Sequence, residues 1–107
     1  MVVLAGDRLG EGDETLGALL MKSFLTSLLE VEAPATLICL NRGIFLSTAG
    51  SPVLEQLQAL EARGTEVLSC GTCLDFYERK DALRVGKVSN MFSIVERMAA
   101  AGRLIRW

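Results

Sequence analysis

The chain has 107 residues, of which half are hydrophobic and 22% are charged. This length and balance predict a single globular domain over residues 1–107 and exclude a disordered chain. Acidic and basic residues are interspersed and the net charge is −2, so no basic surface is expected for nucleic acid. No window approaches the roughly 20 apolar residues of a membrane span, and the amino terminus lacks the basic start of a signal peptide. We therefore expect a cytoplasmic protein that binds neither nucleic acid nor membrane.

The predicted secondary structure alternates between short apolar runs and longer amphipathic stretches. Apolar runs bounded by glycine or proline are typical of buried strands, and apolar residues at helical spacing between a capping residue and a glycine are typical of helices. Strands are predicted at 2–5, 35–40, 66–69 and 103–107, with a weak further strand within 82–88. Helices are predicted at about 13–30, 52–63, 73–79 and 91–101.

This alternation predicts the fold class. Strands that alternate with helices form right-handed βαβ units, which build a parallel sheet with helices on both faces. We expect a three-layer α/β sandwich of flavodoxin-like type, with a mostly parallel sheet of about five strands. Ligands of such sheets bind beyond the carboxyl ends of the strands, so the loops that follow the strands are the places to search for a site.

The three cysteines occupy different positions in these elements. Cys39 lies inside a predicted strand, so we expect it in the core. Cys70 follows a predicted strand and precedes the turn Gly71-Thr72. A thiol at the start of a helix meets free N–H groups that favour the thiolate and lower its pKa, so Cys70 is the candidate nucleophile and should alkylate fastest. Cys73 would lie one helical turn away, within reach of a disulfide or of a group carried on Cys70.

The Cys-X-X-Cys spacing of Cys70 and Cys73 is compatible with more than one role. The chain has no histidine, which excludes a Cys-His or Ser-His hydrolase. One chain also lacks the four ligands of a zinc site, unless copies pool their cysteines in an oligomer. Thiol–disulfide exchange needs only the two thiols and remains open, as does a structural role for two cysteines in a tight turn. We expect no metal and no cofactor.

Four stretches carry a resemblance to a known family. They are, in chain order, DRLGEGDETLGALLMKSFL, CLNRG, GTEVLSCGTCLDFY and VGKVSNMFSIVE, and together they span nearly the whole chain. The sequence resembles the DsrE-like domain of the YedF family, sulfurtransferase-like proteins associated with selenium metabolism. The resemblance implies a parallel α/β fold, an oligomeric assembly and sulfur carried as a persulfide on Cys70, with Cys73 at the position of a second cysteine found in many relatives. Full-length YedF proteins begin with a TusA-like domain that bears a Cys-Pro motif, whereas this sequence begins at the first strand of the DsrE-like domain.

On this basis the expected function is a relay of sulfur or selenium. Cys70 would accept sulfane sulfur from a donor protein and pass it to an acceptor such as a TusA-like domain, while Cys73 modulates or releases it. A dithiol redox module that uses Cys70 and Cys73 is an alternative. A non-catalytic domain whose cleft binds a partner protein is another.

Residues in the other strand-end loops are candidates to line a cleft around the thiols. The glycine-rich stretch at 6–14 does not favour phosphate, because its acids outnumber its one arginine. Its glycines are expected to shape a turn and its acids to favour the helix start. Asn41 can reach the cleft or close a turn. Ser89 or Asn90 can cap the last helix, whose amino terminus would help to hold an anion. The cleft-lining candidates are Asp7, Arg8, Asn41, Gly71, Thr72, Ser89 and Asn90.

The predicted helix at 13–30 has more apolar surface than one sheet face covers. Its apolar arc spans roughly 200°, against about 100° for a typical surface helix, and Met21, Leu25 and Leu29 would face water. We therefore expect a homo-oligomer, a dimer or a trimer, in which these helices pack across an axis. The alternative is that the apolar loop 41–50 folds over the helix within one chain.

Overall fold

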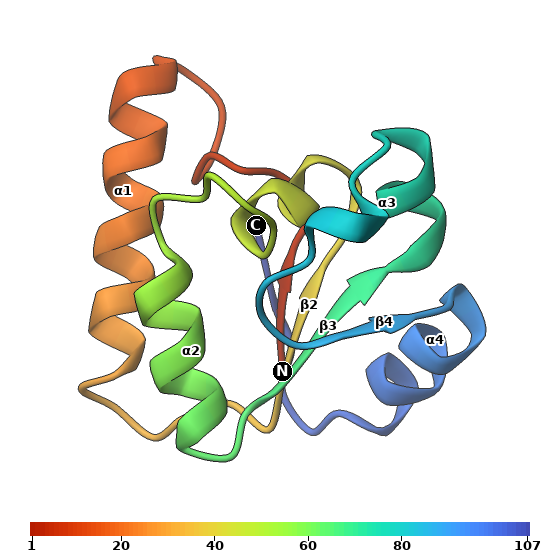
Figure 1. Ribbon diagram of the computed structural model, residues 1–107. Coiled ribbons are helices and arrows are strands. Elements are labelled where there is room, and N and C mark those ends of the chain that lie inside the picture. The colour runs from red at the N-terminus through yellow and green to blue at the C-terminus, as the bar shows by residue number, and fades with distance from the viewer.

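The computed structural model describes all 107 residues, and its centre is a five-stranded sheet (Figure 1). The strand order is β4-β3-β2-β1-β5, and every neighbouring pair of strands is parallel. The predicted parallel sheet of about five strands is confirmed. The strands are β1 (Val2–Leu4), β2 (Thr36–Cys39), β3 (Glu66–Cys70), β4 (Lys87–Ser89) and β5 (Ile105–Arg106).

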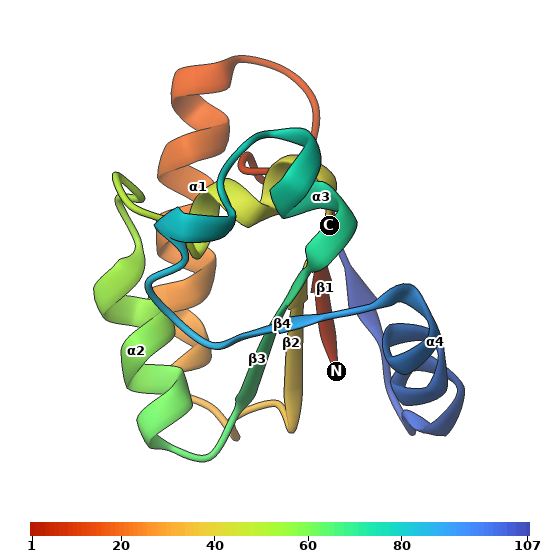
Figure 2. The same cartoon turned by 45° about the vertical axis from the view of Figure 1, so that its right-hand side comes forward.

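Helices cover both faces of this sheet, as predicted. The α-helices are α1 (Glu14–Leu28), α2 (Leu54–Ala62), α3 (Gly71–Phe76) and α4 (Met91–Ala100), and the 3-10 helices are η1 (Asn41–Leu46) and η2 (Lys80–Ala82). Figure 2 shows α1 and α2 on one face, α4 on the other, and α3 with η1 beyond the carboxyl ends of the strands. The segments that follow β2 and β3 therefore meet at one end of the sheet. None of the helices is both long and apolar enough to cross a membrane.

Side chains of the central strands alternate between the two faces and so form two cores. In β1, Val2 and Leu4 belong to the larger core, on the side of α1 and α2, whereas Val3 belongs to the smaller core, on the side of α4. The smaller core has five buried members, namely Val3, Ile38, Leu68, Cys70 and Ile94. The layer on the α4 side is therefore thin.

The orientation of α1 differs from the expectation drawn from the sequence. Met21 and Leu25 are buried in the larger core and Leu29 packs against it, so these side chains do not face water. Ile44 and Leu46 of η1 are buried in the same core, which corresponds to the alternative in which the loop covers the helix within one chain. Periodicity could not decide this point, because it gives the width of an apolar arc and not the element that covers it.

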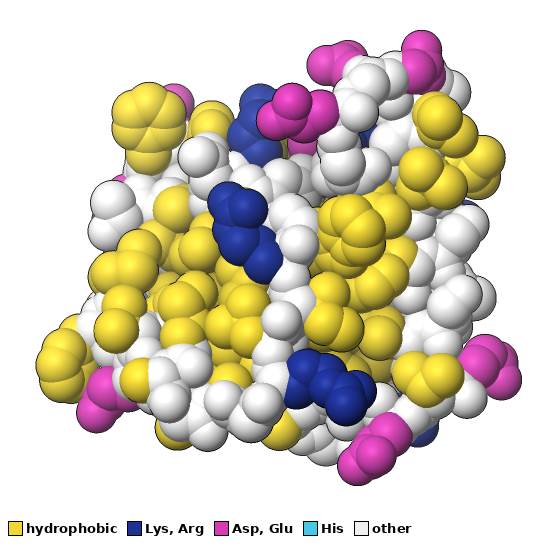
Figure 3. Space-filling view, turned by 180° about the vertical axis from the view of Figure 1, so that it is seen from behind, with side chains coloured by type: hydrophobic (Ala, Val, Ile, Leu, Met, Phe, Trp, Pro, Cys, Tyr) yellow, Lys and Arg dark blue, Asp and Glu magenta, His cyan; other side chains and the backbone are white.

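Apolar side chains gather in two areas on the back of the molecule, one on the α1 side and one on the α4 side (Figure 3). A strip of backbone with Lys or Arg side chains separates the two areas. Leu19 is 61% exposed and Phe92 is 74% exposed. Exposed apolar areas of this kind are typical of interaction surfaces. We define the α1 patch as Leu16, Leu19 and Leu20, and the α4 patch as Val88, Met91, Phe92 and Val95, all of which are exposed.

Gly43 lies where η1 comes closest to β1. A side-chain carbon added at Gly43 would collide with the carbonyl group of Leu4. The backbone N–H of Leu40 donates a hydrogen bond to the same carbonyl oxygen at 2.9 Å. Only glycine fits this close approach, which lets η1 lie directly on the end of the sheet.

We expect Gly43→Ala to destabilise the domain by about 3 kcal/mol or more, because η1 must move off the end of β1 to accommodate the added methyl group. Gly102→Ala is the matched control, since nothing lies within 4 Å of a carbon added there. Urea unfolding followed by circular dichroism gives the free energy of unfolding of both variants. A Gly43→Ala protein as stable as the control would contradict the close approach of η1 to β1.

Candidate functional site

Cys70 and Cys73 lie together at the carboxyl end of β3. Cys70 is the last residue of β3 and immediately precedes α3, while Cys73 lies in the first turn of α3. Both are free thiols, and they are close enough to influence each other's ionisation. Because β4 pairs with β3 in parallel, Ser89 lies beside Cys70. The residues that are neighbours in the sequence thus form one pair of thiols at the end of the sheet where ligands of such folds bind.

The two thiols differ in their exposure to solvent. Cys70 is 2% exposed and packs in the smaller core, whereas Cys73 is half-buried and touches both cores. A reagent in solution therefore meets Cys73 first. This difference works against the expectation that Cys70 alkylates fastest. That expectation relied on the amino terminus of α3, and α3 has only six residues.

Burial raises the pKa of the Cys73 thiol above its ordinary value, and the neighbouring Cys70 thiol raises it further. The backbone N–H of Asn41 donates a hydrogen bond to Cys73 Sγ at 3.1 Å. This bond acts in the opposite direction and lowers the pKa of Cys73. The net shift is upward, because the N–H bond offsets only part of what the thiolate loses on removal from water.

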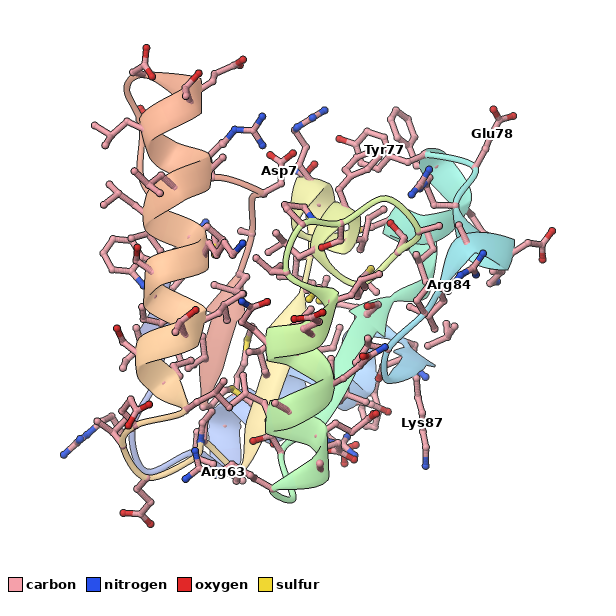
Figure 4. All side chains as sticks on the ribbon, turned by 60° about the vertical axis from the view of Figure 1, so that its left-hand side comes forward. Asp7, Arg63, Tyr77, Glu78, Arg84 and Lys87 are labelled. Carbon is pink, nitrogen blue, oxygen red and sulfur yellow. The ribbon has the colours of Figure 1, made fainter.

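Asn41 is the cleft-lining candidate that reaches the thiols. Its backbone takes a left-handed conformation with φ of 50°, which asparagine adopts more readily than most residues. Its side-chain Oδ1 accepts a hydrogen bond from the hydroxyl group of Tyr77 at 2.9 Å. Figure 4 shows Tyr77 at the same end of the molecule as Asp7. Sequence reasoning missed Tyr77, because this contact depends on how η1 is placed against the end of α3.

The other candidates next to the thiols have structural partners. Gly71 lies against β4, where a carbon added to it would approach the carbonyl oxygen of Ser89 to 3.2 Å. The side chain of Asn90 caps α4 and accepts a hydrogen bond from a backbone amide of the first turn at 2.9 Å. Thr72 is exposed. Gly71 and Ser89 therefore border Cys70, and Asn90 serves the start of its own helix.

Asp7 and Arg8 face a different pocket from the thiols. This pocket, of about 280 Å³, is lined by residues of α1, η1 and the loop before α2, and includes neither Cys70 nor Cys73. The Asp7 carboxylate forms ion pairs with Arg8 at 3.0 Å and with Arg42 at 3.4 Å. Asp7 and Arg8 line this pocket and not the surroundings of the thiol pair, because they follow β1, two strands away from β3 in the sheet.

Cys39 is buried in the larger core, as predicted. Its thiol lies beside the hydroxyl groups of Ser47 and Ser69, which bond to each other at 2.7 Å. Burial raises the pKa of the Cys39 thiol from 9.0 to about 12, and the two hydroxyl groups offset only part of this rise. Cys39 is therefore protonated at neutral pH, and a protonated thiol is not nucleophilic.

The thiol site by itself can support sulfur chemistry. No group of three or more His, Cys, Asp or Glu side chains is arranged to hold a metal ion. The pair of Cys70 and Cys73 offers two sulfur atoms, where a structural zinc site takes four ligands. Two adjacent thiols are sufficient for nucleophilic attack on sulfur and for thiol–disulfide exchange.

Two solved structures share this fold over nearly the whole chain. The crystal structure of the ychN protein from E. coli superposes with a TM-score of 0.71 at 12% identity, and the match covers 99% of this chain and 97% of that chain. The structure of MTH1491, a protein of unknown function from Methanobacterium thermoautotrophicum, gives a TM-score of 0.67 at 19% identity, with 99% and 96% covered. The fold is DsrE-like. No protein-family model matches the chain, and no curated protein does so.

The raised pKa of Cys39 predicts a loss of stability at alkaline pH. Above pH 9.0 the unfolded chain loses the Cys39 proton, while the folded domain keeps it up to about pH 12. The free energy of unfolding should therefore fall by up to about 1.4 kcal/mol per pH unit in this window. Cys39→Ala has no thiol to titrate at this position. The difference in the free energy of unfolding between the unsubstituted protein and this variant should therefore shrink between about pH 8 and pH 10. Urea unfolding at the two pH values measures it, and parallel pH dependence of the two proteins would contradict the burial of this thiol.

Proposed function

We propose that the protein relays sulfane sulfur, carried as a persulfide on Cys70, from a donor protein to an acceptor protein. The observation that carries this proposal is the pair of free thiols at the carboxyl end of a parallel strand, one buried and one half-exposed. Transfer of sulfur between thiols needs a thiolate nucleophile and a thiolate leaving group, and it needs neither a histidine nor a metal. Selenium undergoes the same kind of transfer and is the second cargo that the resemblance to the YedF family implies.

The burial of Cys70 suits a thiol that stores sulfur. Its side chain packs with Ile38, Leu68 and Ile94 in the smaller core. A persulfide held there is shielded from dissolved thiols, which would otherwise attack its outer sulfur atom. Storage therefore favours a buried carrier with a more exposed neighbour, which is the arrangement of Cys70 and Cys73.

The DsrE-like fold supports this proposal. A DsrE-like fold fits a family of the sulfur-relay type. A fold hosts many functions, however, and the chemistry resides in the site. The proposal therefore rests on the thiol pair, and the cargo must be tested directly.

Thiol–disulfide exchange is a second candidate, because the same contact between Cys70 and Cys73 favours it. Formation of a disulfide would convert the two thiols into one S–S bond with loss of two hydrogen atoms to an oxidant. Such a module would cycle between dithiol and disulfide and would hold no extra sulfur. The two candidates thus differ in the mass of the loaded protein.

We expect the protein to gain the mass of one sulfur atom when it is incubated with inorganic tetrasulfide and then freed of the reagent. The adduct should persist in Cys39→Ala, which leaves the site intact, and should be short-lived in Cys70→Ser, which lacks the buried carrier. Intact-mass spectrometry with peptide mapping measures both. A disulfide between Cys70 and Cys73 without any sulfur adduct would favour redox exchange. A protein that forms neither would be a partner-binding domain, and the relay would be refuted.

Association of the chain with itself and with its partners is part of the proposal. The α1 patch and the α4 patch leave several large apolar side chains exposed, and each of them forgoes roughly 1.5–3 kcal/mol relative to full burial. Closed symmetric assemblies are the usual way to cover such surfaces, which favours a homodimer or homotrimer. The donor and the acceptor, such as a TusA-like domain, would approach the thiol end of the sheet.

We expect light scattering to give a mass that is two or three times 11.6 kDa. Leu20→Lys in the α1 patch or Phe92→Lys in the α4 patch should reduce it to that of one chain, because a lysine in an apolar interface must be stripped of water. Val31→Lys is the matched control, since Val31 is exposed and belongs to neither patch. A mass of one chain at every concentration would contradict the oligomer. Substitution of Leu25 is unsuitable, because this residue is in the core.

A further inference from the structure

Two hydrogen bonds connect the sulfur atom of Cys73 to Asn41 and Asn41 to Tyr77. The backbone N–H of Asn41 donates to Cys73 Sγ at 3.1 Å, and the side chain of Asn41 accepts from the Tyr77 hydroxyl at 2.9 Å. Tyr77 directly follows α3, the short helix that carries Cys73. The end of this helix therefore places the phenol whose hydrogen bond holds Asn41, the residue that donates its N–H to the sulfur atom.

Aromatic packing holds the Tyr77 side chain in place. The Tyr77 ring packs edge-on against Phe45 of η1, with a centroid distance of 5.0 Å, and against Phe76, at 5.2 Å. The guanidinium group of Arg42 lies 5.0 Å from the Phe45 ring and that of Arg79 lies 5.4 Å from it. Loss of the hydroxyl group alone would leave these aromatic contacts intact. Tyr77→Phe can therefore remove the hydrogen bond to Asn41 and leave the aromatic side chain packed in place.

The N–H group of Asn41 points to the atom on which charge develops during sulfur transfer. A hydrogen bond to a neutral thiol is weak, whereas one to a thiolate is strengthened by its charge. A fixed donor of this kind stabilises the charged state without having to reorganise during the reaction. It would act when the Cys73 thiolate attacks the outer sulfur of the donor's persulfide, whose own cysteine sulfur leaves as a thiolate, and again when Cys73 departs as a thiolate. The side chain of Cys70 makes no capping hydrogen bond at the start of α3, and its hydrogen-bond partner is the Cys73 thiol.

We infer that Cys73 is the transfer thiol, through which sulfur reaches and leaves Cys70, and that Asn41 and Tyr77 are positioning residues for it. This inference rests on the proposed relay. Cys70 thiolate attacks the outer sulfur of the Cys73 persulfide, a bond forms between that sulfur and Cys70 Sγ, and the bond to Cys73 Sγ breaks. The electron pair of the broken bond goes to Cys73 Sγ, which becomes a thiolate facing the Asn41 N–H. The step is an exchange of sulfur between two thiols and involves no net oxidation or reduction.

Cys70 on β3 is the ionisable group whose charge acts on Cys73. The Tyr77 phenol, directly after α3, is bound to Asn41. Arg42 on η1 is turned towards Asp7, with which it forms an ion pair. A change in the Asn41 hydrogen bond should therefore appear directly in the pH dependence of Cys73.

The first test measures alkylation of each cysteine by iodoacetamide, resolved by peptide mass spectrometry. In the unsubstituted protein Cys73 should react at least about ten times faster than Cys70, because protection by burial must be lifted before Cys70 can react. Tyr77→Phe should slow the reaction of Cys73 at neutral pH by about three- to tenfold, the effect of one weakened hydrogen bond. The pH midpoint of its reactivity should rise, and at high pH the rates should converge.

A matched control separates positioning from general loss of stability. Thr65→Val also removes one hydroxyl group that donates a hydrogen bond, here to the carbonyl oxygen of Pro34 at 2.8 Å, at the opposite end of β3. It should lower stability without a change in the pH profile of Cys73. Asn41→Gly keeps a residue that accepts the left-handed conformation but removes the acceptor for Tyr77. It should reproduce the effect of Tyr77→Phe, and the double variant should be no slower than either single one, since all three break the same bond.

The inference is overturned if Cys70 is alkylated before Cys73, or if Tyr77→Phe changes the rate of Cys73 equally at every pH.

The order of transfer has its own test, with inorganic tetrasulfide as the donor. Cys73→Ser should load Cys70 at least about ten times more slowly than the unsubstituted protein, because the more accessible of the two thiols is lost. Normal loading of Cys70 in Cys73→Ser would refute Cys73 as the transfer thiol and leave the relay standing. No loading of the unsubstituted protein, with the alkylation results as expected, would refute the relay and leave the positioning of Cys73 standing.

Discussion

The hydroxyl groups of Ser47 and Ser69 bond to each other at 2.7 Å inside the domain, and the placement of the thiol site depends on this contact. Ser69 belongs to β3, while Ser47 directly follows η1. The carbonyl oxygen of Ser47 also accepts hydrogen bonds from the backbone amides of Arg84 at 2.9 Å and Val85 at 3.3 Å. One buried residue thus ties η1, β3 and the chain before β4 together. Because η1 is fixed in this way, its first residue, Asn41, can present an N–H group to a sulfur atom on α3.

The register of β2 and β3 places Cys39 and Cys70 on opposite faces of the sheet. Cys39 lies opposite Ser69 in the parallel pair, so both side chains point towards the larger core. Cys70 is one residue further along β3 and therefore points to the other face. There only α4 covers the sheet, and the layer is thin. The same alternation that buries Cys39 beyond the reach of solvent places Cys70 next to the half-exposed Cys73.

The sequence was sufficient for the parallel fold and for the pairing of Cys70 with Cys73, because both follow from local patterns. Strand-helix alternation determines the direction of the strands, and only the two residues Gly71 and Thr72 separate the two cysteines, which leaves little freedom in their relative position. The positions of Asp7 and Arg8 could not be derived in this way. They depend on how many strands separate two loops, and the order of strands in a sheet is not a local property. Tyr77 and the buried side of α1 were missed for a related reason. Both depend on η1, an irregular segment whose position is set by buried hydroxyl groups and a close glycine contact rather than by periodicity.

The two outer strands of the sheet, β4 and β5, contain three and two residues. Each carries an exposed basic side chain, Lys87 on β4 and Arg106 on β5. Short, charged edges offer few free backbone groups to another chain and repel their own copies, which is how natural sheets resist pairing edge to edge. Side chains of the two apolar patches, and not backbone, are therefore the available contacts between molecules. Contacts through these patches can therefore form without the edge-to-edge pairing of strands that builds fibrils.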